Sequence, residues 1–140
     1  MHPEDIWFME HMALNTPHSL DEFCTIAQRA LGLPAFELDA ENETEWGIAV
    51  KDGVEYNVSR PFADGQLKAW DATCPEGSNF GLILIFPRSS SATPETSEPV
   101  VSAVASRLAS AFATPVVHHR TWLAPGTSLA RSAKYQSAVG

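Results

Sequence analysis

Cysteine and histidine are the side chains most often used for nucleophilic catalysis, and this chain has two cysteines and five histidines. Cys74 lies in a predicted loop, where a base such as His118 could approach it in space. Asp71 and Glu76 lie close to Cys74 in the sequence, and nearby carboxylates raise the pKa of a thiol, whereas a nucleophile needs a lowered pKa. We therefore assign no catalytic residue and expect a protein that is not an enzyme.

Metal and cofactor binding are not indicated by the sequence either. His118 and His119 are adjacent on a predicted strand, so their side chains point to opposite faces and cannot chelate one ion together. The stretch 39–43 resembles the start of a calcium loop, but Thr44 stands where glycine is needed and Val50 where glutamate is needed. The chain has no phosphate-binding loop, dinucleotide fingerprint, nucleophile elbow or paired zinc cysteines. We expect no metal and no cofactor.

Acidic and aromatic side chains gather in the middle of the chain. Residues 35–76 hold ten acidic and three basic side chains, against five and one in residues 1–34 and two and five in residues 77–140. Such a run is most simply a solvated face. The alternative is a surface for a basic partner protein, because aromatic anchors with a charged rim give interfaces affinity and a fast on-rate. The predicted partner-binding residues are Glu41, Glu43, Glu45, Asp64, Trp70, Asp71 and Glu76.

Charge and hydropathy exclude several other partners. The formal charge of −8 disfavours direct binding of nucleic acid, which depends on clustered lysine and arginine. The longest clean apolar run, Leu82–Phe86, is far too short to cross a bilayer. The acidic N-terminus lacks the features of a secretory leader, so we expect a cytoplasmic protein with Cys24 and Cys74 as reduced thiols. The oligomeric state is left open.

Two helices are predicted. The capping-box sequence 19–22 opens the first, whose apolar stripe includes Cys24, a buried structural thiol, and Gly32 with Pro34 stops it. The second follows the Ser, Thr and Pro linker 89–97, carries an apolar stripe from Val101 to Phe112, and ends before Pro115.

Strands are predicted at 36–39, at 46–50 and 54–58 around an Asp-Gly turn, at 80–86 in the sheet centre, and at 116–123. The loop 60–79 is long enough to be functional or to hold a short element near residues 67–70. The fold class is α+β, a single domain with an antiparallel or mixed sheet of about four to five strands and two helices packed on it. Residues 1–18 are assigned to a flexible extension, 19–126 to the domain, and 127–140 to a loosely ordered tail. Trp46 and Tyr56 are most simply core residues of the hairpin.

Three segments, Glu55–Pro61, Trp70–Gly81 and Val117–Leu123, give the chain a resemblance to small bacterial immunity proteins of type VI secretion and polymorphic toxin systems. The resemblance spans roughly residues 19–126. It implies a protein that binds one cognate secreted toxin in the cytoplasm of the producing cell and occludes its active site, without catalysis of its own. If that active site is basic, Glu43, Glu45, Asp64 and Asp71 could occupy it as phosphate substitutes.

Two other functions stay open at this point. The first is an acidic secretion chaperone that holds an exported effector unfolded, which small size, acidity and the order of a helix followed by a hairpin also suit. The second is a small enzyme that uses Cys74 or His118.

Overall fold

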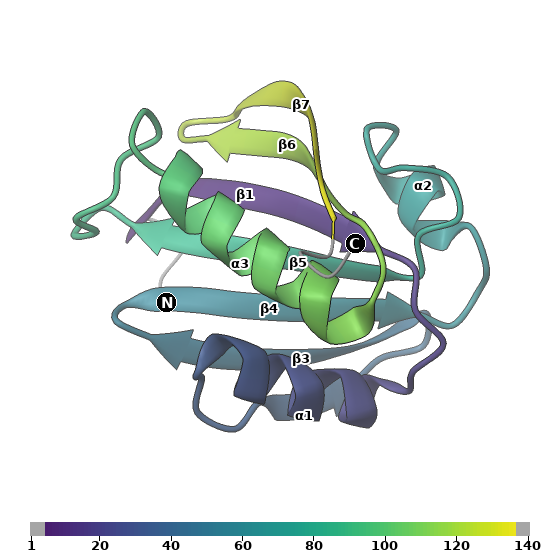
Figure 1. The fold of residues 1–140 in the computed structure, drawn as a ribbon. Coiled ribbons are helices and arrows are strands. Elements are labelled where there is room, and N and C mark those ends of the chain that lie inside the picture. Colours follow the sequence, from purple (N-terminus) through teal and green to yellow (C-terminus); the bar gives the residue numbers. More distant parts are fainter. Residues whose placement is uncertain (1–4, 137–140) are drawn as a thin grey trace.

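The computed structural model describes residues 5–136, and this part of the chain forms seven strands and three helices. The strands are β1 (Ile6–Leu14), β2 (Glu37–Ala40), β3 (Thr44–Lys51), β4 (Val54–Pro61), β5 (Phe80–Pro87), β6 (Val116–Leu123) and β7 (Thr127–Tyr135). The helices are α1 (Leu20–Leu31), α2 (Gln66–Trp70) and α3 (Glu98–Phe112). Figure 1 shows α1 and α3 lying across one broad sheet.

The strands join in the order β2-β3-β4-β5-β1-β6-β7, and every neighbouring pair is antiparallel. The predicted α+β class is confirmed, together with the Asp-Gly hairpin, the central position of β5 and the two long helices. The sheet has seven strands rather than four or five, and the short helix α2 forms within the long loop where the sequence indicates a possible element.

The predicted flexible extension over residues 1–18 is wrong for its described part. β1 crosses the middle of the sheet and pairs with β5 on one side and β6 on the other. Phe8 and Met12 are 0% and 1% exposed. A strand of this kind is predicted from apolar side chains at every second position. Glu10 interrupts that pattern, because it is a buried carboxylate at a position where an apolar side chain is expected. Residues 1–4 lie outside the described residues.

The predicted loose tail over residues 127–140 is also wrong for most of its length, because β7 pairs with β6 from Thr127 to Tyr135. Eight of the nine residues of β7 are exposed, so this edge strand is held mainly by its backbone hydrogen bonds. Exposed edge strands need no hydrophobic alternation, which is why the sequence pattern does not indicate it. Residues 137–140 lie outside the described residues.

Local sequence signals fix both long helices. Ser19 and Glu22 exchange hydrogen bonds as the predicted capping box of α1, and Gly32 ends that helix in the left-handed region at φ 64°. α3 starts after Ser97 with a proline in its first turn. The hydroxyl of Ser97 makes no capping hydrogen bond to α3, and it donates instead to a buried carboxylate that is described below.

The core lies between the sheet and these two helices. The ring of Phe23 in α1 stacks on that of Phe80 in β5, with centroids 4.3 Å apart. Gly47 of β3 passes directly beneath α1, where an added Cβ would lie 2.7 Å from Leu38 Cδ2 and 3.0 Å from Cys24 Sγ. Cys24 is buried as predicted, and burial raises the pKa of its thiol to about 12. The close approach of helix and strand therefore depends on glycine at this position.

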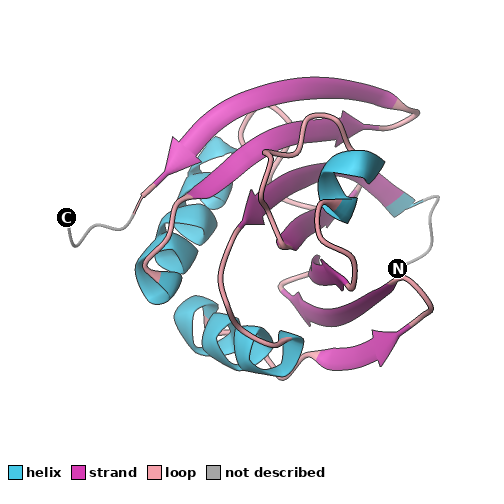
Figure 2. Cartoon of the chain, turned by 90° about the vertical axis from the view of Figure 1, so that its right-hand side faces the viewer, coloured by secondary structure: helices cyan, strands magenta, loops and turns pink. Residues whose placement is uncertain are grey.

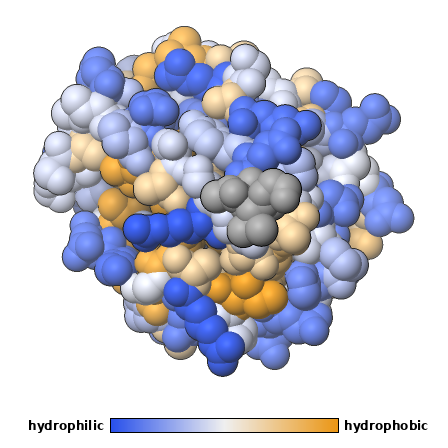
Figure 3. Space-filling model, viewed as in Figure 1, coloured by the Kyte–Doolittle hydropathy of each residue, from blue (hydrophilic) through white to orange (hydrophobic). Residues whose placement is uncertain are grey.

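The two faces of the sheet have different surroundings. The helix face carries α1 and α3, which Figure 2 shows together on one side, and Phe8, Met12 and Leu14 of β1 belong to the core there. The open face carries the alternate residues, and the segment 62–79 with α2 lies against one end of it, next to His11 and Ala13. Figure 3 views the molecule from the side of α1 and α3, where blue hydrophilic residues surround smaller orange apolar patches. No helix within residues 5–136 is long and apolar enough to cross a membrane.

Candidate functional site

One hollow of about 520 Å³ lies between the β2–β3 turn and the end of α2. Its walls are Glu41, Asn42, Glu43, Thr44 and Trp70. The peptide N–H of Glu41 donates to the carbonyl of Thr44 over 2.8 Å, which closes the turn. The N–H of Phe62 donates to the carbonyl of Glu43 over 3.0 Å, so the segment that leads into α2 is joined to the same turn.

Two large aromatic side chains are exposed in this region, Trp70 in the wall of this hollow and Phe62 in the wall of a second one. Trp70 is 48% exposed and Phe62 is 53% exposed, whereas most large apolar side chains of the chain are buried. Glu41 and Glu43 are exposed beside them. We call these four residues, Glu41, Glu43, Phe62 and Trp70, the acidic–aromatic surface. Among the predicted partner-binding residues, the structure thus brings together Glu41, Glu43 and Trp70, and Phe62 is an addition that burial reveals.

The other predicted contact residues are dispersed. Asp64 lines an adjoining hollow of about 340 Å³ that it shares with Phe62. Glu45 instead lies near the start of α1 and accepts a hydrogen bond from Arg60 over 3.1 Å. Glu76 is exposed in the loop after α2 and does not line the hollow of Trp70.

Asp71 is an internal anchor rather than a surface contact. Its Oδ2 accepts a hydrogen bond from Arg120 Nε over 2.8 Å, and its Oδ1 accepts from the amide and hydroxyl of Thr73. Burial alone would raise the pKa of this carboxyl, but the hydrogen bonds from Thr73 and Arg120 outweigh it and lower the pKa to about 2. Asp71 therefore ties the end of α2 to β6 across the open face of the sheet.

A smaller pocket of about 200 Å³ lies between the open face and α2. Its polar lining includes His11 from β1 and His119 from β6, whose ring centroids are 6.2 Å apart. His119 Nδ1 lies 2.8 Å from the hydroxyl of Thr73, whereas the buried Nδ1 of His11 has no hydrogen-bond partner within residues 5–136. Burial lowers the pKa of both imidazoles to about 4, so both rings are neutral at neutral pH.

Cys74 also lines this pocket and is 2% exposed. Burial raises the pKa of its thiol above the ordinary value, and the carboxylate of Asp71 adds to that increase. The pairing of Cys74 with His118 that the sequence leaves open is wrong, because His118 lies on the helix face with α3 while Cys74 lies on the open face. The predicted opposite orientations of His118 and His119 are confirmed.

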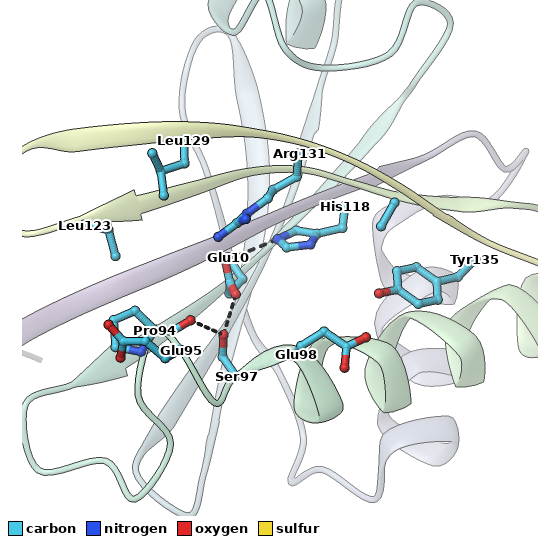
Figure 4. A pocket seen from close by; sticks show the side chains of 11 residues that line it. Glu10, Pro94, Glu95, Ser97, Glu98, His118, Leu123, Leu129, Arg131 and Tyr135 are labelled. Atoms are coloured by element: carbon cyan, nitrogen blue, oxygen red, sulfur yellow. Dashed lines mark hydrogen bonds and ion pairs between the residues drawn. The ribbon is translucent and has the colours of Figure 1, made fainter.

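A larger pocket, of about 500 Å³, lies between the start of α3 and strands β6 and β7 (Figure 4). Glu10 reaches its inner wall from β1 and is 2% exposed. One carboxylate oxygen of Glu10 accepts hydrogen bonds from the hydroxyl of Thr121 and from His118 Nε2, the latter over 3.2 Å. The other oxygen accepts from the hydroxyl of Ser97 over 2.8 Å, and Arg131 Nε donates to Thr121 Oγ1 over 3.0 Å.

Burial of Glu10 would by itself raise the pKa of its carboxyl. The hydrogen bonds from His118, Thr121 and Ser97 outweigh that effect, and the pKa lies below its ordinary value. Both oxygens are occupied, so Glu10 links β1, α3 and β6 as an ionised acceptor rather than standing ready as a general base. This centre is not predicted from the sequence, because residues 1–18 are assigned there to a flexible extension and Glu10 interrupts the alternation of Phe8, Met12 and Leu14.

Within residues 5–136, no three histidine, cysteine, aspartate or glutamate side chains converge as a metal site would require. Comparison with protein-family models, with curated proteins and with solved structures finds no match for this chain. The geometry of the acidic–aromatic surface and of the two pockets is therefore the basis for a functional proposal.

Proposed function

We propose that this protein is an immunity protein that binds a cognate secreted bacterial toxin in the cytoplasm and occludes the toxin's active site. The observation that carries the proposal is the acidic–aromatic surface. The half-exposed Trp70 shares a hollow there with the exposed Glu41 and Glu43, and the half-exposed Phe62 is joined to Glu43 through its backbone amide. The proposal also rests on the resemblance of three sequence segments to immunity proteins.

The aromatic residues supply the energetic core of the proposed interface. Trp70 is the last residue of the short helix α2 and leaves nearly half of its surface in water. Aromatic side chains that become fully desolvated in a complex account for a large share of binding energy in protein interfaces. Trp70 is therefore the proposed central contact, with Phe62 beside it on the same surface.

The carboxylates supply the selectivity for charge. Glu41 and Glu43 are exposed, and residues 35–76 have an excess of seven acidic side chains, from ten acids and three bases. This field attracts a basic partner and speeds its association at low ionic strength. The earlier set of phosphate substitutes becomes smaller, because Glu45 and Asp71 are hydrogen-bonded to arginines of the same chain. Glu43 and Asp64 stay in that role, and Glu41 joins them.

The test is co-expression with the toxin encoded beside this chain, followed by calorimetric titration of the purified folded partners. We expect rescue of growth, a complex of fixed stoichiometry, and a dissociation constant that rises with salt. Trp70→Ala should weaken binding by about tenfold or more without loss of folding. Glu43→Lys should weaken it and reduce the salt dependence.

The matched control is Glu55→Lys, which makes the same charge change on β4 near the opposite end of the β3–β4 hairpin. It should leave affinity close to that of the unaltered chain. Equal weakening by Glu55→Lys and Glu43→Lys would mean that only net charge matters, and the proposed surface would be wrong. Binding to an unfolded but not to the folded partner would favour the secretion-chaperone function instead.

A further inference from the structure

The pocket of about 200 Å³ between the open face and α2 has a feature that the interface proposal does not use. His11 is 7% exposed, and its buried Nδ1 has no hydrogen-bond partner within the described residues. A neutral imidazole has one N–H donor and one acceptor, and a buried polar atom without a partner is unfavourable. Native proteins keep such atoms rarely, and a ligand that enters the pocket and displaces the atoms covering this nitrogen would supply the missing hydrogen bond.

Besides the neutral polar side chains of Ser59, Cys74 and His119, the rest of the lining is apolar or consists of a paired acid and base. Leu67, Trp70 and Ile83 form apolar walls. The two charged residues at the pocket, Asp71 and Arg120, are bonded to each other over 2.8 Å and so present no net charge. A charged ligand would lose its hydration without gaining a counter-charge, so the lining favours a neutral ligand.

Gly81 of β5 forms part of the pocket lining. A Cβ added at Gly81 would lie 3.3 Å from Ser59 Oγ and 3.5 Å from Leu67 Cδ2. The φ of Gly81 does not require glycine, so the close packing of Ser59 and Leu67, rather than backbone strain, distinguishes this position from alanine. A cavity of about 150 Å³ with apolar walls holds benzene, so about 200 Å³ has room for one substituted aromatic ring.

We propose that this pocket, the His11 pocket, binds a neutral aromatic ring that carries one hydrogen-bonding group, with that group bonded to His11. A phenol fits this description, whether it is a free small molecule or a tyrosine side chain of a bound protein. Trp70 borders both the His11 pocket and the acidic–aromatic surface, so a partner seated on that surface has its side chains within reach of the pocket. The proposal does not require the toxin-binding function to be correct.

The test uses the full chain and two probes, p-cresol and toluene, titrated separately while the two-dimensional amide NMR spectrum is recorded. We expect saturable shifts at Gly81, Ile83 and His119, with p-cresol bound about fivefold more tightly than toluene because of its one additional hydrogen bond. In His11→Phe the preference for p-cresol should disappear while toluene still binds. In Gly81→Ala both probes should bind more weakly.

The amide spectrum of each variant verifies that it is folded before binding is compared. Shifts confined to other residues, an absence of saturation, or an undiminished preference for p-cresol in His11→Phe would overturn the proposal. If His11→Phe does not fold, Gly81→Ala still tests the proposal. Undiminished binding of both probes to Gly81→Ala would mean that the binding site lies elsewhere.

A final titration of p-cresol into the complex with the toxin distinguishes the two sources of the ring. Loss of p-cresol binding in the complex, restored by truncating a tyrosine of the toxin, would assign the pocket to a partner side chain. Unchanged binding would assign it to a free small molecule. Both results keep the pocket as an aromatic site and differ only in what fills it.

Discussion

Moderate acid should destabilise this protein because two buried histidines cannot readily take up protons in the folded state. His11 and His119 have pKa values of about 4 in the fold, against an ordinary value of 6.5. The unfolded chain therefore binds more protons than the folded chain between these values. The stability that the neutral rings contribute is fully present above about pH 6.5 and is lost as the pH falls through the folded pKa near 4.

The size of the effect follows from the two pKa values. A difference of 2.5, which is 6.5 minus 4, corresponds to about 3 kcal/mol for each histidine. The steepest part of the curve, near pH 5, should have a slope of about 1.2 kcal/mol per pH unit for each group and about 2.4 for both. Asp71 adds little to the slope in this pH window. The pKa of its carboxyl is lowered to about 2, so the stability that the ionised carboxylate contributes is lost only below about pH 4.

The assay is urea unfolding followed by circular dichroism at a series of pH values between about 7 and 4.5. His11→Phe should remove one titrating group, so the slope of the unfolding free energy near pH 5 should fall by about half. Ile83→Val is the matched control, because it removes one methylene group beside His11 and lowers stability without changing the number of titrating groups. A slope in the unaltered chain below about 0.7 kcal/mol per pH unit, or one that His11→Phe leaves unchanged, would refute the reasoning.

Two further predictions concern the packing of the sheet against its helices. Glu10→Ala should lower the unfolding free energy by about 3–5 kcal/mol in urea titration, because it leaves three buried donors without their acceptor. Glu10→Gln should cost less, since its carbonyl oxygen still accepts, and equal losses in both variants would contradict the hydrogen-bond explanation. Gly47→Ala should lower stability by about 1–3 kcal/mol through contact with Leu38 and Cys24. Adding Leu38→Ala should recover part of that loss, and an unchanged melting temperature in Gly47→Ala alone would show that no close contact exists.

The parts of the fold that the sequence predicts well are those governed by local rules. The capping box at Ser19 and the Asp-Gly turn before β4 each depend on neighbouring residues, and both form as expected. β5 is predicted because it is apolar on both sides, which only a central strand needs. β1 and β7 are missed for opposite reasons, since Glu10 interrupts the buried pattern of one and the other is almost entirely exposed.

The candidate site also has parts that the sequence predicts and parts that it does not. Glu41, Glu43 and Trp70 are predicted from the acidic and aromatic residues in the middle of the sequence, and the structure places these three around one hollow. Their role in partner binding stays a prediction. The unpartnered Nδ1 of His11 cannot be predicted from the sequence. Whether this nitrogen has a partner depends on which side chains of the segment 62–79 pack over β1. Which polar atoms lack a partner is a property of the assembled structure, and a histidine in a sequence does not show whether its nitrogens are satisfied.

Asp71 shows how the acidic–aromatic surface depends on residues that need not touch the partner. α2 has only five residues, no buried side chain and no side-chain cap, so it has little stability of its own. The hydrogen bonds that Asp71 accepts from Thr73 and Arg120 join the end of α2 to β6, where Arg120 lies 49 residues further along the chain. Trp70 is the residue immediately before this anchor. We therefore expect Asp71→Ala to lower the affinity for the partner by displacing Trp70. Arg120, the donor to Asp71, lies on the open face of the sheet, and Arg120→Ala should lower the affinity by the same amount. That result would distinguish the indirect effect from a direct contact between Asp71 and the partner.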